Sequence, residues 1–275
     1  MNPKHPISLT NLQKTLLITL YAKAIESACQ DSILKDRFAA EAIEQIDFDF
    51  SRFQLSHNAI VALAIRAKAL DRWTEAFIEE HKQANVVHIG CGLDSRTFRL
   101  RPGKDVTWWD VDYPEVISLR EKIYPKQPGC RLLGANILEN DWLKTISPNV
   151  PTIVIAEGVL PYLSEADASK FLANVVSHFQ AGQIAFDAYN RWGIWWLNRL
   201  PIMRQTQERL HWAVDDPRLL EKTVPTLRLN VENTNGLPEF VPRAGFWART
   251  AFRLSRGVTP LRRIGQLLLY DFGRF

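Results

Sequence analysis

The chain has 275 residues, of which 46% are hydrophobic and 23% charged, and its formal net charge is +4. This is the composition of an ordinary soluble globule with a sizeable core, so it excludes a disordered or fibrous protein, and so mild a charge does not indicate nucleic-acid binding. The three cysteines, Cys29, Cys91 and Cys130, form no CxxC pair. We therefore expect a reduced, cytoplasmic protein without a metal site or a nucleic-acid partner.

The first 82 residues carry only helical signals. Apolar residues recur at helical spacing in the windows 9–27, 36–46 and 58–81. The apolar run in the first window is too short to cross a bilayer and is flanked by Lys14 and Lys23, and no signal-peptide pattern precedes it. The sequence thus predicts a helical cap over residues 1–82 and no membrane span.

From residue 85 onward, short β-rich runs alternate with helical windows. The predicted strands cover residues 85–90, 105–112, 130–136, 151–158 and 183–189. Proline begins the predicted helix at 114–123, and Ser164 is the expected N-cap of the helix at 164–179. Strands that alternate with helices predict an α/β fold, with a doubly wound, mostly parallel sheet covered on both faces.

The remaining residues combine both kinds of signal. Helical windows at 191–213 and 244–256 alternate with predicted strands at 224–234 and 265–275. The sequence contains no internal repeat, low-complexity tract or Ser/Gly linker. We therefore expect residues 1–275 to form a single domain with elaborations.

The first predicted strand ends in Gly90-Cys91-Gly92. In a doubly wound sheet the ligand binds where the first strand turns into its helix, and glycines let it approach the backbone. The next strand ends at Asp112, where a carboxylate can accept two hydrogen bonds from ribose hydroxyls. These residues predict a site for an adenosine-containing cofactor, with a tight turn that binds nothing as the plainer alternative.

The residues after the glycines distinguish between two such cofactors. The dinucleotide fingerprint requires a third glycine at position 95, but the chain has Ser95 there, preceded by Leu93 and Asp94. A negative Asp94 would repel a pyrophosphate, whereas it suits the ammonium and sulfonium groups of S-adenosylmethionine. Together with the helical cap, this chemistry favours S-adenosylmethionine over NAD.

Three stretches resemble motifs of the leucine carboxyl methyltransferase family, including its bacterial branch similar to the tetracenomycin polyketide O-methyltransferase. They are "VVHIGCGLDSRTFRL", "WWDVDYPEVISLR" and "TIVIAEGVLPYLSEAD". The resemblance runs from about residue 10 to about 190, and more loosely to the end. It implies a Rossmann-like class I methyltransferase with an N-terminal helical cap, a donor-binding core at 83–190, and an inserted helical lid with C-terminal strands at 191–275. The implied activity is S-adenosylmethionine-dependent O-methylation, typically of a carboxylate.

The same resemblance implies roles for single residues. Gly90 and Gly92 would line the donor's amino-acid end, Asp112 would hold its ribose and Asn136 would lie at its adenine. Ile137 would also bind the donor, and Glu157 would contact it from the opposite side. Lys23 and Arg66 would contact the donor carboxylate or the acceptor, and Tyr162 would point at the reaction centre. Bacterial relatives more often have arginine where Lys23 stands. The eukaryotic enzymes have Asp at the position of Asn136, which argues against that branch rather than against donor binding.

The expected acceptor determines which catalytic groups are needed. A carboxylate has a pKa of about 4, so it arrives ionised and needs only a cation and a hydroxyl to orient it, for which Arg66 and Tyr162 are the candidates. A phenol, with a pKa of about 10, would need a base. His88 is expected to be a core or strand-end histidine, whereas His211 in the lid is freer to act as a base.

Two charged residues near the glycines have structural alternatives. Asp94 is expected either to contact the donor ammonium or to stabilise the turn, whereas Arg96 is expected to form an ion pair behind the turn.

Two further patterns concern the lid. Trp192, Trp195, Trp196 and Leu200 fall on one helical face, which predicts either cap packing or a wall of the acceptor pocket. From residue 243 onward, seven arginines accompany a single acid, Asp271. Such charges usually form a solvated face; an acidic carrier protein that presents the acceptor is the sharper alternative.

Three functions follow as hypotheses. The first is esterification of a carboxylate on a small secondary metabolite such as a polyketide, by a monomer or homodimer. The second is methylation of a protein's C-terminal carboxylate, and the third is a non-catalytic, donor-binding subunit.

Overall fold

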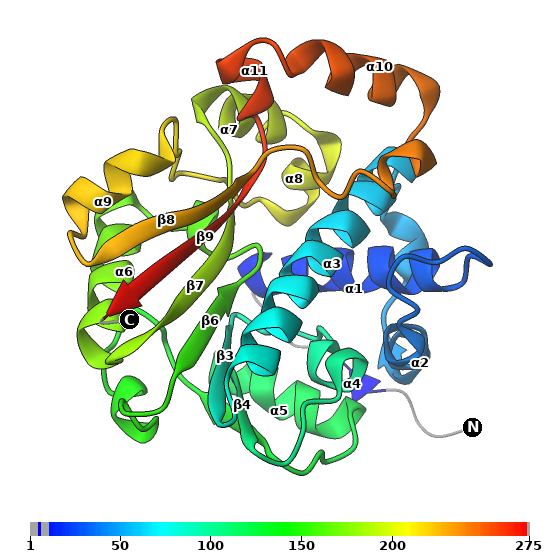
Figure 1. The fold of residues 1–275 in the computed structure, drawn as a ribbon. Coiled ribbons are helices and arrows are strands. Elements are labelled where there is room, and N and C mark those ends of the chain that lie inside the picture. The colour runs from blue at the N-terminus through cyan, green and yellow to red at the C-terminus, as the bar shows by residue number, and fades with distance from the viewer. Residues whose placement is uncertain (1–4, 7–10, 274–275) are drawn as a thin grey trace.

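A computed structural model describes residues 5–6 and 11–273 of the chain. The described residues form a seven-stranded sheet in the order β5-β4-β3-β6-β7-β9-β8 (Figure 1). Its strands are β3 (Ala84–Ile89), β4 (Val106–Asp112), β5 (Cys130–Gly134), β6 (Thr152–Ala156), β7 (Ala181–Ala188), β8 (Leu227–Asn233) and β9 (Gln266–Gly273). Strands β3 to β7 pair in parallel, and β9 is antiparallel to both β7 and β8. The predicted mostly parallel sheet is thereby confirmed.

Helices cover both faces of this sheet, because its central strands are apolar on both sides. On one face, Val86 and Ile153 pack against Leu70 of α3 (His57–Glu80). On the other face, Val87 packs in one cluster with Phe171 of α6 (Glu165–His178). Ser164 caps α6 by accepting a hydrogen bond from the Asp167 amide, as expected from the sequence.

The cap consists of α1 (Asn11–Ser27), α2 (Arg37–Gln45), the short 3₁₀ turn η1 (Phe50–Arg52) and α3. The expectation of helical signals alone misses one small feature, a two-residue parallel pairing of β1 (His5–Pro6) with β2 (Ile46–Asp47). Leu17 and Leu20 of α1 share a core with Leu93, which lies directly after the glycine turn. The cap is therefore packed against the C-terminal end of β3, where the cofactor was expected.

Short helical elements follow most of the parallel strands. They are α4 (Arg96–Leu100), α5 (Pro114–Ile123), η2 (Leu143–Thr145) and η3 (Leu160–Tyr162). None of the described helices is both long and apolar enough to cross a membrane.

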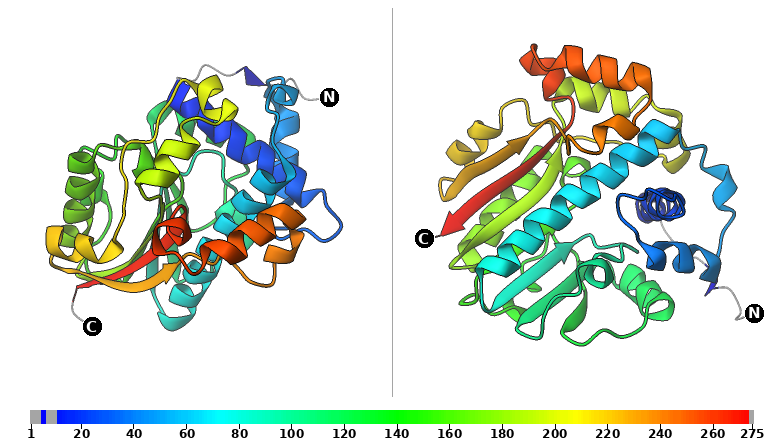
Figure 2. Two further views of the ribbon diagram at one scale, coloured as in Figure 1. Left: turned by 90° about the horizontal axis from the view of Figure 1, so that it is seen from above. Right: turned by 45° about the vertical axis from the view of Figure 1, so that its right-hand side comes forward.

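The lid comes from two insertions into the end of the sheet. Between β7 and β8 lie α7 (Arg191–Leu197), α8 (Pro201–Thr206), η4 (Pro217–Leu219) and α9 (Leu220–Thr223). Between β8 and β9 lie η5 (Val241–Arg243), α10 (Phe246–Ser255) and α11 (Thr259–Arg262). Figure 2 shows helices of the cap and of both insertions gathered at one end of the sheet.

The helical window expected at 191–213 is wrong in its extent. The helix α7 ends at Leu197, Pro201 begins α8, and the residues after Gln207 up to 213 are not helical. Proline lacks the amide that a continuing helix would need, and it disfavours helical backbone in the residue before it, here Leu200. The face expected to join Trp192 to Leu200 is consequently split between two elements.

Candidate active site

The backbone of the turn after β3 explains its two glycines. Gly90 and Gly92 have φ values of +57° and +49°, in the left-handed region that other residues rarely adopt. A Cβ at Gly90 would collide with the side chain of Val159, and one at Gly92 would lie 3.1 Å from the Cβ of Leu16. Both glycines are therefore required by the conformation of the turn and by the crowding around it.

Asp112, at the end of β4, holds this turn in place. Its Oδ2 accepts a hydrogen bond from the Gly92 amide at 2.7 Å, and its Oδ1 accepts one from the Tyr113 amide at 2.7 Å. Burial raises the pKa of the Asp112 carboxyl, although the two amides act in the opposite direction. The residue also lines the cavity described below, so its carboxylate can accept further hydrogen bonds from a ligand.

A ligand that binds the ionised form of Asp112 should bind less tightly in acid. Because the pKa of Asp112 is raised, its protonation begins at a higher pH than for an exposed aspartate. We expect the affinity for S-adenosylhomocysteine, the demethylated donor, to fall as the pH decreases from about 7 towards about 4. Calorimetric titration across this range measures the effect. A profile as flat as that of an Asp112→Asn variant would contradict it.

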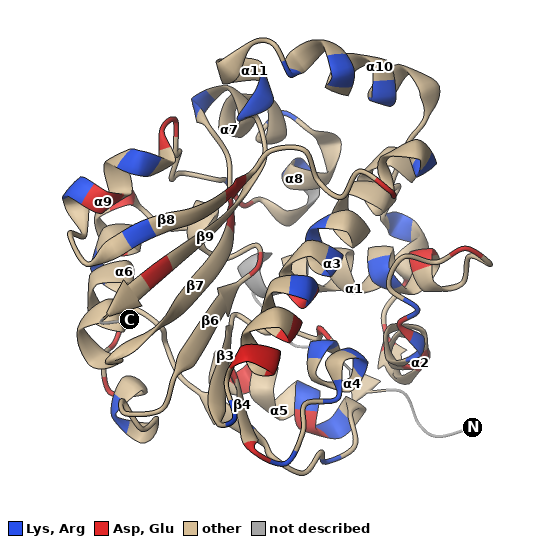
Figure 3. Cartoon of the chain, viewed as in Figure 1, with Lys and Arg blue, Asp and Glu red and all other residues tan. Residues whose placement is uncertain are grey.

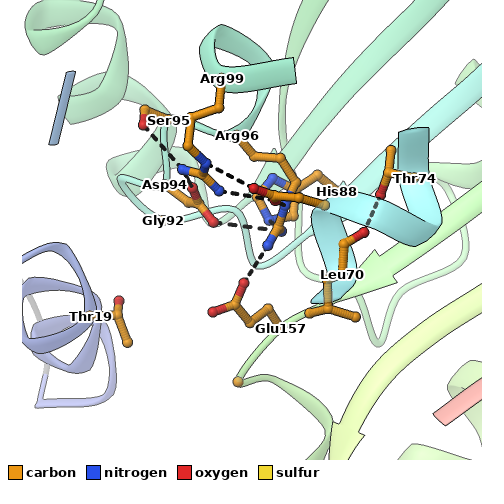
Figure 4. A network of polar contacts seen from close by, with 12 residues as sticks. Thr19, Leu70, Thr74, His88, Gly92, Asp94, Ser95, Arg96, Arg99 and Glu157 are labelled. Atoms are coloured by element: carbon orange, nitrogen blue, oxygen red, sulfur yellow. Dashed lines mark hydrogen bonds and ion pairs between the residues drawn. The ribbon is translucent and has the colours of Figure 1, made fainter. Parts of the chain in front are cut away.

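Glu157, which follows β6, belongs to a buried ion-pair network, and Figure 4 shows its contact with Arg96. Its Oε1 lies 3.4 Å from Lys23 Nζ and 3.1 Å from Arg66 Nη2, and its Oε2 pairs with Arg96. Burial opposes ionisation of Glu157, but these three cations outweigh it and hold the pKa of the carboxyl well below its usual value. One carboxylate thus joins the cap, the glycine turn and the end of β6.

Asp94 and Arg96 belong to the same network. Asp94 accepts from Lys23 at 2.7 Å and pairs with Arg99 at 2.7 Å, so it braces the turn, which is one of its two expected roles. Arg96 is fully buried, and its Nε lies 2.7 Å from Asp71 of α3. The expected structural ion pair of Arg96 is confirmed.

Arg66 is held by two carboxylates rather than free to bind another. Its Nε and Nη2 both face Glu157 Oε1, at 3.2 and 3.1 Å, and its Nη1 lies 3.0 Å from Asp187 Oδ2. Tyr189 donates a hydrogen bond to Asp187 at 3.1 Å, and Asp187 also accepts from the Gly158 amide. Because one edge of the guanidinium already faces Glu157, a free bidentate fork for an acceptor carboxylate is absent from this arrangement.

Asp187 is a site residue that the sequence reasoning missed. It lies at the end of β7, is buried, and lines the cavity beside Arg66. The available signal was an acid within the mostly apolar predicted strand at 183–189, because an isolated buried charge must find a partner.

The two candidate histidines lie in different surroundings. His88 is buried in β3, with Nδ1 3.3 Å from Asp110 and Nε2 2.9 Å from Arg96. Burial and the charge of Arg96 lower its pKa. The prediction of a core histidine is confirmed. His211 is exposed and is not among the residues that line the cavity.

A cavity of about 860 Å³ connects these residues with the lid. The predicted site residues that line it are Lys23, Arg66, Gly90, Gly92, Asp94, Asp112, Ile137, Glu157 and Tyr162. The lid contributes an apolar wall that includes Trp196, Leu200, Met203 and Phe252. Of the predicted tryptophan face, then, only Trp196 and Leu200 line the cavity, and all three tryptophans are exposed.

Asn136 is the predicted site residue that the structure does not bring to the cavity. Its Oδ1 accepts a hydrogen bond from the Leu138 amide at 3.1 Å, and its Nδ2 donates to Glu139. Its neighbours Ala135, Ile137 and Leu138 line the cavity instead.

The described part of the chain contains no candidate metal-binding site. Within residues 5–6 and 11–273, no group of three or more His, Cys, Asp or Glu side chains is placed to hold a metal ion.

Comparisons with known proteins agree on one family. The sequence model of the leucine carboxyl methyltransferases matches residues 16–176. The chain is 37% identical to the tetracenomycin polyketide synthesis O-methyltransferase TcmP of Streptomyces glaucescens, over 97% of this chain and 98% of that protein. It is 30% identical to the S-adenosyl-L-methionine-dependent methyltransferase dpfgK of Gibberella zeae, over 92% and 96% of the two chains.

Solved structures agree on the fold. A methyltransferase described as putative from Thermobifida fusca superposes with a TM-score of 0.55 at 13% identity, over 92% of this chain and 94% of that one. A DUF574 family protein of Streptomyces avermitilis superposes with a TM-score of 0.57 at 11% identity, over 94% and 97%. At such low identity these likenesses concern the Rossmann-like fold alone.

Proposed function

The chain belongs to the leucine carboxyl methyltransferase family, and from this we infer that it esterifies a carboxylate of a small secondary metabolite, such as a polyketide. Its activity at the coarser level is S-adenosyl-L-methionine-dependent methyl transfer. The observation that carries the finer proposal is the state of the possible bases in the cavity. The acids Asp94, Asp112, Glu157 and Asp187 and the histidine His88 all have hydrogen-bond or ion-pair partners. An acceptor that is already ionised suits such a site, because it needs no base.

The residues around the glycine turn fit the donor. The carboxylate of Asp112 lines the cavity and can accept hydrogen bonds from ribose hydroxyls. Gly90 and Gly92 line the cavity, and Ala135 and Ile137 offer apolar contacts for a purine ring. Asn136, whose amide is engaged in its own turn, is left with the minor role of shaping that wall.

The bound donor supplies a methyl group that its positive sulfur activates for in-line displacement. The residues of the chain then have to orient the acceptor and exclude water. We assign the apolar lid wall with Trp196, Leu200 and Phe252 to the body of the acceptor. Arg66 lines the cavity, but it is fixed between Glu157 and Asp187, so its charge is shared with these two carboxylates and it offers the acceptor no free fork.

Tyr162 is the hydroxyl assigned to the acceptor. It lines the cavity, and burial raises its pKa to about 12, so it is protonated and able to donate a hydrogen bond at neutral pH. A carboxylate that accepts this bond would be held with one oxygen free to attack the methyl group.

Removing that hydroxyl is expected to slow turnover selectively. One hydrogen bond to a charged group is worth about 1.5–3 kcal/mol, so Tyr162→Phe should lower kcat/KM about 10- to 100-fold while donor affinity stays unchanged. Tyr21→Phe is the matched control, because Tyr21 packs in an aromatic cluster of the cap and does not line the cavity. Turnover equal to that of the control would refute the assignment.

The chemical nature of the product separates the acceptor classes. Transfer of a tritiated methyl group should be tested on small carboxylic acids, on phenols and on peptides with a free C-terminus. A methyl ester releases volatile methanol in alkali, whereas an aryl methyl ether does not. Alkali-stable product from phenols would overturn carboxylate esterification. Transfer to peptides but not to small acids would instead assign the activity to protein C-termini.

A further inference from the structure

Large apolar side chains are exposed in one part of the lid to an extent that no role in methyl transfer explains. Of the exposed large apolar side chains in the described residues, one is Leu219 and the others belong to α7, α10, α11 and the link before α11. Apart from Trp196, which also lines the cavity, these are Trp192, Trp195, Phe246, Trp247, Leu254, Val258 and Leu261, which we call the apolar lid face. Exposed apolar groups gathered in this way mark a contact surface rather than ordinary surface scatter.

The elements that carry the apolar lid face lie next to one another. Asn190, the N-cap of α7, donates a hydrogen bond to the Pro260 carbonyl of α11 at 2.6 Å. Gly193 of α7 lies directly against the Ile264 carbonyl, where a Cβ would clash. The helices α10 and α11 are consecutive and in contact, and Figures 1 and 2 show them at the outer end of the molecule.

The helix α10 has two different faces. Ala248, Arg249 and Phe252 line the cavity, so one face points inward. Trp247 and Leu254 do not line the cavity and are 81% and 75% exposed. At about 100° per residue, these two lie close together on the side away from Phe252. The outward face of α10 is therefore apolar although it faces solvent.

The elements that carry this face contain arginines without acids to balance them. Residues 240–270 contain six arginines and no Asp or Glu, and Figure 3 shows basic but no acidic positions on α10 and α11. Within the described residues, Arg243 and Arg263 are paired with carboxylates of other elements. Arg253 and Arg256 form no ion pair with a described carboxylate, and both belong to α10 or its C-cap.

We propose that the apolar lid face binds the surface of an anionic phospholipid bilayer. Arginines beside tryptophan, phenylalanine and leucine form the pattern of helices that lie in the membrane interface, where indole rings are favoured and anionic headgroups attract the cations. A second copy of this chain fits poorly, because a two-fold contact of this face with itself would bring the arginines of both copies, including Arg253 and Arg256, into one interface without acids. A protein partner would need a groove complementary to tryptophans that project from several elements. A fluid bilayer can accommodate these side chains without such a groove.

The membrane contact would place the lid where it can receive an acceptor from the bilayer, an inference that rests on the proposed function. The inward face of α10 lines the acceptor end of the cavity while its outward face meets the bilayer. A lipophilic acid dissolved in the membrane would then lie next to the cavity that receives it. The membrane contact itself can be tested without any methyl transfer.

Sedimentation with lipid vesicles tests the proposal on the full chain. Vesicles of phosphatidylcholine with about one third phosphatidylglycerol should bind the protein, with a blue shift of tryptophan fluorescence; phosphatidylcholine alone should bind at least about tenfold less, and added salt should weaken the binding. Exchanging Trp247 and Leu254 together for serine should lower the partition coefficient about 100-fold or more. R253Q with R256Q should lower it about tenfold or more.

Leu219→Ser is the matched control, because Leu219 is also exposed but lies outside the apolar lid face. It should bind vesicles like the unchanged protein. Methylation of a water-soluble acceptor should also be unchanged in the Trp247/Leu254 variant, so failure of the membrane contact is distinguishable from failure of the proposed function.

Several results would overturn the membrane contact. Absence of binding to either vesicle would do so, as would equal binding by the Trp247/Leu254 variant. A concentration-dependent dimer that this variant abolishes would assign the face to self-association. Binding of an acidic carrier protein, in the absence of vesicle binding, would assign it to protein docking.

Discussion

An Asp112→Ala variant should bind S-adenosylhomocysteine about 100-fold or more weakly than the unchanged protein, because two hydrogen bonds to a carboxylate, worth about 1.5–3 kcal/mol each, are lost. The carboxylate lies at the end of β4 and lines the cavity. It also holds the Gly92 amide at 2.7 Å, so the variant loosens the glycine turn as well. Both effects act in the same direction, and isothermal titration calorimetry measures their sum.

Two further variants separate these effects. Asp112→Asn keeps one acceptor oxygen and the size of the side chain. Its affinity for S-adenosylhomocysteine should lie between those of the unchanged protein and the Asp112→Ala variant. Asp105→Ala removes an exposed aspartate just before the same strand and should bind normally. Undiminished affinity in a folded Asp112→Ala protein would remove Asp112 from the donor site.

A Glu157→Gln variant should be the most destabilised of the single changes. Its carboxylate faces three buried cations, Lys23, Arg66 and Arg96. An amide leaves them without their shared counter-charge, and loss of one partner from a buried ion pair costs about 3–5 kcal/mol. Urea unfolding should measure this decrease in the free energy of unfolding. Glu121→Gln makes the same chemical change at an exposed position of α5 and should leave stability nearly unchanged.

The pH dependence of stability provides an independent check on Glu157. The pKa of Glu157 is lowered in the folded protein, so its contribution is fully present above the ordinary glutamate pKa of about 4.3 and is lost as the pH falls further. The difference in stability between the unchanged protein and Glu157→Gln should therefore shrink in acid. A difference that stayed constant from about pH 7 to about pH 3 would show that the lost charge is not the cause.

The sequence was informative wherever a feature depends on residues close together in the chain. The predicted strands and the helices at 114–123 and 164–179 depend on local apolar periodicity and on capping residues, and the structure confirms them. Gly90 and Gly92 were identified from their place directly after the first predicted strand, and the structure adds that both have a left-handed backbone. Asp112 followed from its place at the end of the second strand, where parallel strands bring their carboxyl ends together.

In the lid, the prediction made from the spacing of apolar residues was wrong. Spacing placed Trp192 and Leu200 on one helical face, but Pro201 starts a new helix and only Trp196 and Leu200 reach the cavity. Exposure is a property of the neighbours that a helix finds, so the composition of α10 could not reveal that Trp247 faces solvent while Phe252 faces the cavity.

By itself, the sequence determined the sheet, the glycine turn and the kind of cofactor. Only the tertiary structure decided which buried charged side chains pair with one another. Arg66 is bonded to Asp187, which is 121 residues away in the sequence, and to Glu157, which is 91 residues away. These contacts hold in place a guanidinium that was expected from the sequence to be free for a ligand. The physical reason is that backbone conformation and apolar periodicity are set within a few residues, whereas a buried charge is balanced by whichever partner folding brings within a few ångströms.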